Sequence, residues 1–108
     1  YVQHKAQLQV KLALKAADLL KEGGSMVYSV CTLSPEECEG VLTTLLHERP
    51  ALKIVPADLP GKIGRPGLSA FRNRTFSPGM EHARRLYPQD HNTQSFFIAK
   101  LVKGREQK

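Results

Sequence analysis

The order of helix and strand patterns along this sequence predicts an α/β fold. An apolar strand at residues 25–33 precedes a helix at 35–48 and a short strand at 52–55. A further helix lies ahead of them and a further strand behind, as in the closing part of a doubly wound sheet. We therefore expect one α/β domain of 108 residues, in the order helix-strand-helix-strand-loop-strand.

The first helix is predicted over residues 3–22. Apolar residues recur there at helical spacing, and additional leucines and alanines widen the stripe, which indicates a well-buried helix. Gly23 and Gly24 supply a left-handed stop. No capping residue opens the pattern, so we expect a partial domain, a piece of something longer.

The strand at residues 25–33 and the helix after it form the central pair of elements. Met26, Val27 and Tyr28 indicate a strand that is buried on both faces, as in a parallel sheet. Ser34 and Glu37 form a capping box that predicts a helix start at Pro35. This helix is expected to face inward through Val41, Leu42, Leu45 and Leu46.

Residues 56–88 are predicted to form a long basic loop, because five prolines interrupt any long element there. The closing strand is expected at residues 95–102, around the apolar run FFIA. The chain carries a net charge of +6 that is unevenly distributed. Residues 1–59 hold six Lys or Arg against seven Asp or Glu, whereas residues 60–108 hold ten against three. The second half is therefore the candidate surface for a polyanion.

Arginines alternate with aromatic residues in this basic half, a mixture that suits phosphate contact and base stacking. The candidate RNA-binding residues are Arg72, Arg74, Arg84, Arg85 and His91. The alternative is that these residues form an ordinary solvated surface. The four histidines are scattered, with no carboxylate or cysteine at metal-ligand spacing from them, so we predict no metal site.

Cys31 is the candidate catalytic residue. It follows an apolar strand and precedes a predicted helix start, where unpaired N–H groups favour a thiolate. Ligands of doubly wound sheets bind beyond the carboxyl ends of the strands, where Cys31 would lie. The alternative is a buried cysteine that fills a small apolar space.

The spacing of Cys31 and Cys38 matches no zinc or redox motif, so both are expected to be reduced in a cytoplasmic protein. No run approaches the roughly 20 apolar residues of a membrane span. The N-terminus has no signal-peptide pattern, and we expect no membrane partner.

Two separated runs, GGSMVYSVCTLSPEE at residues 23–37 and RLYPQDHNTQSFFIAK at residues 85–100, together resemble the Sun/Fmu/RsmB family of RNA cytosine-5 methyltransferases. The first run is similar to the family's VYSTCS strand and the PEENE run that follows it. The second run looks like its last shared stretch. The resemblance implies a class I, Rossmann-like fold and the transfer of a methyl group from S-adenosylmethionine to C5 of cytosine in tRNA or rRNA.

Within this resemblance Cys31 takes the place of the nucleophile that adds to C6 of cytosine. The family uses a second cysteine in an upstream Pro-Cys motif, and Cys38 is not that residue, because it lies downstream where the family has asparagine. The glycine-rich cofactor loop and the acidic ribose ligand of the family are absent, so cofactor-binding residues are expected upstream of this chain. The chain alone is expected to be inactive, with RNA and the missing N-terminal half as its partners.

Two other interpretations remain open. The chain could be a non-catalytic basic RNA-binding or complementing subunit that retains the fold. It could also be an unrelated α/β domain in which Cys31 is merely buried, which predicts slow alkylation of that thiol.

Overall fold

The computed structural model describes residues 2–56, 64–71, 74–91 and 95–104. The chain begins with helix α1 (Val2–Leu19), strand β1 (Ser25–Val30), helix α2 (Glu39–Glu48) and strand β2 (Leu52–Val55). Four short strands and a 3₁₀ helix (Met80–His82) follow among the described residues: β3 (Arg65–Pro66), β4 (Ala70–Phe71), β5 (Arg74–Thr75) and β6 (Arg84–Leu86). Helix α3 (Pro88–His91) and the long strand β7 (Phe96–Lys103) close the described chain.

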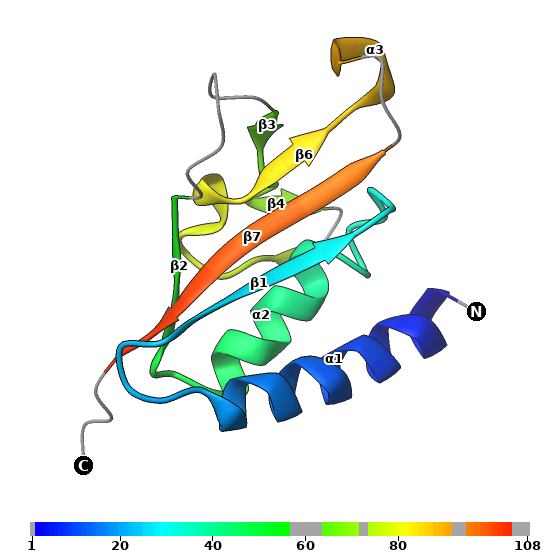
Figure 1. The fold of residues 1–108 in the computed structure, drawn as a ribbon. Coiled ribbons are helices and arrows are strands. Elements are labelled where there is room, and N and C mark those ends of the chain that lie inside the picture. The colour runs from blue at the N-terminus through cyan, green and yellow to red at the C-terminus, as the bar shows by residue number, and fades with distance from the viewer. Residues whose placement is uncertain (1, 57–63, 72–73, 92–94, 105–108) are drawn as a thin grey trace.

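Strand β7 is the centre of the main sheet (Figure 1). One of its edges pairs with β1 over the whole length of that strand, from Ser25 opposite Val102 to Val30 opposite Phe97. The other edge pairs with β2 and with β6. Every one of these pairings is antiparallel, whereas the sequence pattern indicated a parallel sheet. The two strands β1 and β2 run parallel to each other, but β7 lies between them and pairs antiparallel with both, so they share no hydrogen-bonded edge.

Helices α1 and α2 lie side by side against the sheet (Figure 1). The covered face of the sheet carries Tyr28 from β1 and Phe97, Ala99 and Leu101 from β7, all of them buried. From α2, the predicted inward residues Val41, Leu42 and Leu45 are buried, and Leu46 packs against them. These side chains make up the hydrophobic core.

The opposite face of β1 is open. Val27 is 59% exposed, and the burial of the strand alternates residue by residue. The prediction of a strand buried on both faces is therefore wrong for the described chain, since only one face is covered by helices. The predicted wide apolar stripe of α1 is also wrong for the described chain, because Leu8, Leu12 and Leu19 are exposed to solvent.

The segment predicted as one long loop contains β3, β4, β5, the 3₁₀ helix and β6 among its described residues. Strand β6 joins β7 in the main sheet, and β3 pairs with β6. These strands are two or three residues long, which is too short to give a periodic pattern in the sequence. None of the described helices combines the length and apolar composition that crossing a membrane requires.

Candidate functional site

Cys31 is the first residue after β1, and its side chain is exposed and unbridged. It opens the Cys31 loop, which we define as residues 31–38, between the end of β1 and the start of α2. The alternative in which Cys31 is a buried apolar filler does not fit this exposure. A solvent-accessible thiol at the end of a strand can reach an external electrophile.

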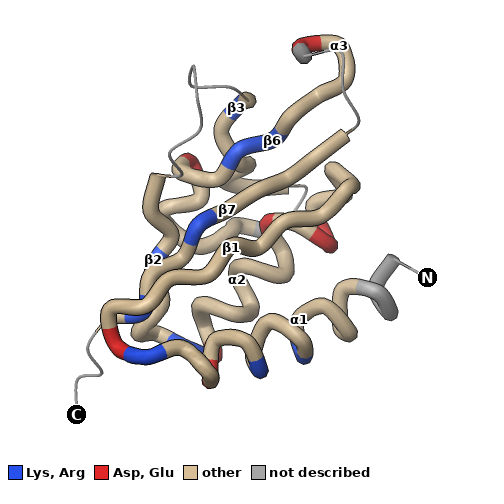
Figure 2. Tube along the Cα trace, in the orientation of Figure 1, with Lys and Arg blue, Asp and Glu red and all other residues tan. Residues whose placement is uncertain are grey.

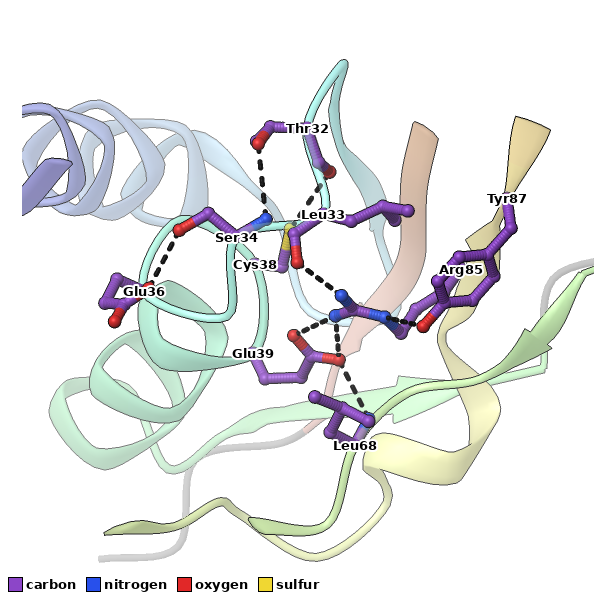
Figure 3. Close-up of polar contacts among 9 residues, drawn as sticks. All are labelled: Thr32, Leu33, Ser34, Glu36, Cys38, Glu39, Leu68, Arg85 and Tyr87. Carbon is purple, nitrogen blue, oxygen red and sulfur yellow. Dashed lines mark hydrogen bonds and ion pairs between the residues drawn. The ribbon is translucent and has the colours of Figure 1, made fainter. Parts of the chain in front are cut away.

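The predicted capping box does not form, and α2 begins at Glu39 instead of Pro35. The backbone carbonyl of Ser34, and not its hydroxyl, accepts the N–H groups of Glu37 at 3.0 Å and Cys38 at 3.1 Å. The Ser34 hydroxyl donates to a carboxylate oxygen of Glu36 at 2.8 Å (Figure 3). Residues 35–38 therefore form hydrogen-bonded turns, and Cys31 lies eight positions before the helix. The helix-end argument for a thiolate at Cys31 loses its structural basis.

Cys38, unlike Cys31, is shielded from solvent. Its side chain is fully buried, and its Sγ donates to the carbonyl oxygen of Thr32 at 3.3 Å (Figure 3). Burial, together with the negative charge of Glu39, raises the pKa of the Cys38 thiol well above its ordinary value. Cys38 is therefore held as a neutral thiol inside the protein.

A buried ion pair lies beneath the Cys31 loop (Figure 3). Nη1 of Arg85 donates to both carboxylate oxygens of Glu39, at 2.6 Å each. Glu39 is fully buried and Arg85 is 4% exposed. The same carboxylate accepts the backbone N–H of Leu68 at 2.8 Å. The pair thus joins the start of α2 to β6 and to the loop after β3.

The remaining nitrogens of Arg85 are also bonded. Nη2 donates to the carbonyl oxygen of Leu33, and Nε donates to the hydroxyl oxygen of Tyr87 at 3.0 Å. Burial lowers the pKa of Arg85, but the hydrogen bonds to Glu39 and Tyr87 outweigh it, so that this pKa stays above its ordinary value. Arg85 is therefore a charged residue whose donors are directed into the protein.

Tyr28 and Arg65 make further contacts around the Cys31 loop and β6. The Tyr28 hydroxyl donates to the carbonyl oxygen of Glu37 at 2.6 Å, which ties β1 to the last turn of the loop. Arg65 in β3 donates to both carboxylate oxygens of Asp90, at 2.8 Å and 2.9 Å, and its guanidinium lies 4.7 Å from the ring centre of Tyr87. Neither Glu39 nor Arg65 was singled out from the sequence.

Of the five predicted RNA-binding residues, only Arg84 and Arg85 have side chains that the structure describes. Arg72 lies outside the described residues, the backbone of Arg74 belongs to β5, and His91 ends α3. Arg84 in β6 is half-buried, and Figure 2 shows basic residues on the neighbouring strands β3, β6 and β7. Arg85 requires a correction, since its buried guanidinium is bound to Glu39 and does not face solvent. We remove it from the candidate RNA surface.

The described residues contain no group of three or more His, Cys, Asp or Glu side chains that could hold a metal ion. The loop offers the exposed Cys31 thiol to solvent, and the buried residues Cys38, Glu39 and Arg85 hold the loop from beneath.

The whole described architecture has close counterparts among solved structures. The crystal structure of a methyltransferase homolog protein from Pyrococcus horikoshii matches with a TM-score of 0.85 and 38% identity, over 94% of this chain and 32% of that one. The structure of NSun6 from the same organism matches with a TM-score of 0.76 and 37% identity, over 94% of this chain and 23% of that one. The predicted class I, Rossmann-like methyltransferase fold is thereby confirmed.

Sequence relatives agree with this class. Residues 1–102 match the family described as 16S rRNA methyltransferase RsmB/F. The chain is 40% identical over 102 residues to the 25S rRNA (cytosine-C(5))-methyltransferase nop2 of Schizosaccharomyces pombe. This match covers 91% of this chain and 16% of that protein. It is 38% identical over 104 residues to the tRNA (cytosine(49)-C(5))-methyltransferase of Pyrococcus abyssi, covering 96% and 33% respectively.

The chain belongs to the RsmB/F methyltransferase family. This confirms the resemblance drawn from the two sequence motifs, and it excludes an unrelated α/β domain. The chain spans 16% of the fission yeast relative and 33% of the archaeal one.

Proposed function

We propose that this chain is the C-terminal part of an RNA cytosine-5 methyltransferase and that Cys31 is its nucleophile. The observation that carries the proposal is the exposed thiol at the end of β1, in a chain of this family. Relatives that act on rRNA and on tRNA match about equally well, so the proposed substrate is a cytosine in one of these RNAs.

In the proposed reaction the Cys31 thiolate forms a bond to C6 of the target cytosine. The electrons of the C5–C6 double bond then make C5 nucleophilic, and C5 accepts a methyl group. Loss of the C5 proton and expulsion of the Cys31 thiolate restore the aromatic ring. Cys38 is unsuited to accept that proton, because it is buried and its raised pKa keeps it protonated. We assign the proton transfer to a base outside this chain.

The proposed methyl donor is S-adenosylmethionine, which supplies an electrophilic methyl group when bound. The described residues of this chain do not fit its binding site. Among the carboxylates of the Cys31 region, Glu37 and Glu39 are buried, Glu39 is bound to Arg85, and Glu36 accepts the Ser34 hydroxyl. The left-handed glycines lie in separate turns and form no glycine-rich cradle. We therefore propose that upstream residues bind the cofactor and that the 108-residue chain alone is inactive.

Within the described chain, the unpaired edge and the uncovered face of β1 support the proposal that an upstream part of the domain packs against this chain. Strand β1 pairs with β7 on one edge, and no described strand pairs with its other edge. Val27 is exposed on the uncovered face, although strands of doubly wound sheets are usually covered on both faces. We propose that the N-terminal half of the catalytic domain covers this region.

Arg72, Arg74, Arg84 and His91 remain the proposed RNA contacts, on the basis of the charge of residues 60–108. We also propose that the enzyme acts in the cytoplasm, because its two free cysteines suit a reducing compartment.

The test is the trapping of a covalent adduct between the full-length natural protein and RNA that contains 5-fluorocytosine, whose C5 fluorine blocks the final elimination. The wild-type protein and a Cys38→Ser variant should form a denaturation-resistant adduct, and Cys31→Ser should form none. An adduct that survives in Cys31→Ser would eliminate the nucleophile assignment. RNA binding without any adduct in the wild type would favour the non-catalytic RNA-binding subunit instead.

A further inference from the structure

The two peptide carbonyls that follow Cys31 in the chain are both held by buried side chains. The Thr32 carbonyl accepts the Cys38 thiol at 3.3 Å, and the Leu33 carbonyl accepts Nη2 of Arg85 (Figure 3). These donors come from the last residue of the Cys31 loop and from β6, and both side chains are buried. The two hydrogen bonds are part-buried, so water competes with them less than at an exposed site, and they hold the loop backbone next to Cys31 from beneath.

The strand register places Val30, which precedes Cys31, in the same row of the sheet as Arg85. Val30, the residue before Cys31, lies opposite Phe97 of β7, and Phe97 lies opposite Arg85 of β6. Val30, Phe97 and Arg85 thus form one row across the sheet. Cys31 is joined to this row on its N-terminal side through the backbone of Val30 and on its C-terminal side through the bond from Arg85 to Leu33.

Glu39 and Tyr87 restrict the guanidinium of Arg85 to one orientation. Nη1 is bound to both carboxylate oxygens of Glu39 and Nε to the hydroxyl of Tyr87, which leaves Nη2 directed at Leu33. A planar guanidinium can bond to three separate partners in fixed directions, whereas a lysine ammonium is a compact charge on a flexible stem. The geometry of the contact to Leu33 therefore requires arginine and not merely a positive charge.

We propose that Arg85 and Cys38 are positioning residues, which set the direction in which Cys31 presents its sulfur by fixing the Leu33 and Thr32 carbonyls. This inference rests on the proposed role of Cys31 as nucleophile. The sequence pattern assigned Arg85 to RNA contact from its charge and its aromatic neighbours, and its buried contacts give it this different role.

A nucleophile has to approach C6 in a narrow range of directions, and a displacement of about 1 Å can lower a rate about 100-fold. Arg85→Lys keeps a charge for Glu39 but cannot also hold Leu33, so we expect adduct formation to slow about 10- to 100-fold. Cys38→Ala removes one weak hydrogen bond, and we expect a loss of about 2- to 10-fold. Cys38→Ser retains a donor and should restore most of the rate.

The experiment measures single-turnover adduct formation by the full-length natural protein with saturating 5-fluorocytosine RNA. RNA affinity and melting temperature are measured for each variant, and rates are compared well below every melting temperature. Arg49→Lys is the matched control, because Arg49 also binds a carboxylate through two hydrogen bonds, to Asp18, but does so on an exposed surface away from the Cys31 loop.

The proposal expects slow adduct formation in Arg85→Lys and Cys38→Ala, RNA affinity within about twofold of wild type, and an unchanged rate in Arg49→Lys. A purely structural role would lower the melting temperature and leave the rate per folded molecule unchanged, which would overturn the proposal. If Arg85→Lys fails to fold, the difference between Cys38→Ala and Cys38→Ser decides, and equal rates in these two variants count against it. A wild-type protein without adduct refutes the proposed function itself, a result distinct from failure of the positioning role.

Discussion

Replacing Arg85 by methionine should strongly destabilise the fold. Methionine is unbranched and similar in length, but it leaves the Glu39 carboxylate fully buried without its cation. It also removes the donors to the Leu33 carbonyl and the Tyr87 hydroxyl. Removing one partner of a buried ion pair typically costs about 3–5 kcal/mol. Because the Arg85 side chain is 5% exposed and that of Glu39 is 0% exposed, solvent screening cannot reduce this figure much.

The measurement is urea unfolding near neutral pH, with the free energy of unfolding compared between the wild type and Arg85→Met. Arg49→Met is the control, since it removes the cation of the exposed pair with Asp18, where water screens the remaining charge. Adding Glu39→Gln to Arg85→Met removes the uncompensated charge. The double variant should therefore be more stable than Arg85→Met alone by at least about 1 kcal/mol.

A loss in Arg85→Met that is no larger than the loss in Arg49→Met would refute the assignment of a buried, mutually dependent pair. The Glu39→Gln single variant is measured as well. If the double variant lost only the sum of the Arg85→Met and Glu39→Gln losses, the assignment would also be refuted, because residues in one buried network are expected to couple.

Three further predictions concern the cysteines and one glycine. In the native protein iodoacetamide should modify Cys31 readily and Cys38 only after unfolding, as peptide mass mapping would report; equal labelling would contradict the burial of Cys38. Because the Cys38 pKa is raised from its ordinary 9.0, its contribution to stability is fully present below about pH 9 and is lost as the pH rises further, toward the folded pKa. Cys38→Ser should flatten the alkaline fall in the free energy of unfolding, and an identical slope would contradict the shift. Gly67→Ala would place a methyl group 2.5 Å from the Met80 carbonyl oxygen, so we expect a loss of about 1–3 kcal/mol in urea unfolding, and an unchanged midpoint would show that this contact can relax.

Much of the fold could be predicted because its signals are local. The spacing of apolar residues located α1 and α2, and the left-handed conformation of Gly23 lies at the predicted helix stop. The last strand was expected at residues 95–102 and is observed at Phe96–Lys103. Each of these features depends on residues close together in the sequence, so a single pattern is enough to reveal it.

The capping box failed because two local structures compete for the same residues. Ser34 carries both a hydroxyl and a carbonyl oxygen, and the carbonyl accepts the Glu37 N–H that the hydroxyl was expected to accept. Ser34, Pro35 and Glu37 are equally compatible with either arrangement. Side chains that can hydrogen-bond locally offer the backbone alternatives to a regular helix start, and the surrounding packing selects one of them.

The ion pair beneath the Cys31 loop could not be predicted, because its partners are separated by 46 positions. Glu39 follows other acidic residues and Arg85 follows another arginine, so both look like ordinary surface charges in the sequence. Only the register of β6 and β7, together with the start of α2, brings them together.

This pairing changes how the charge of the second half should be interpreted. Arg85 is neutralised by Glu39, and Arg65 is bound to Asp90, so two of the arginines in residues 60–108 are already paired with carboxylates. A count of basic residues overstates the charge that an RNA backbone would meet, because phosphate attraction depends on cations that face solvent. Within the same basic segment, neighbouring arginines thus have opposite roles: Arg84 keeps its candidacy for RNA contact, while Arg85 is bound inside the protein beneath the loop that carries Cys31.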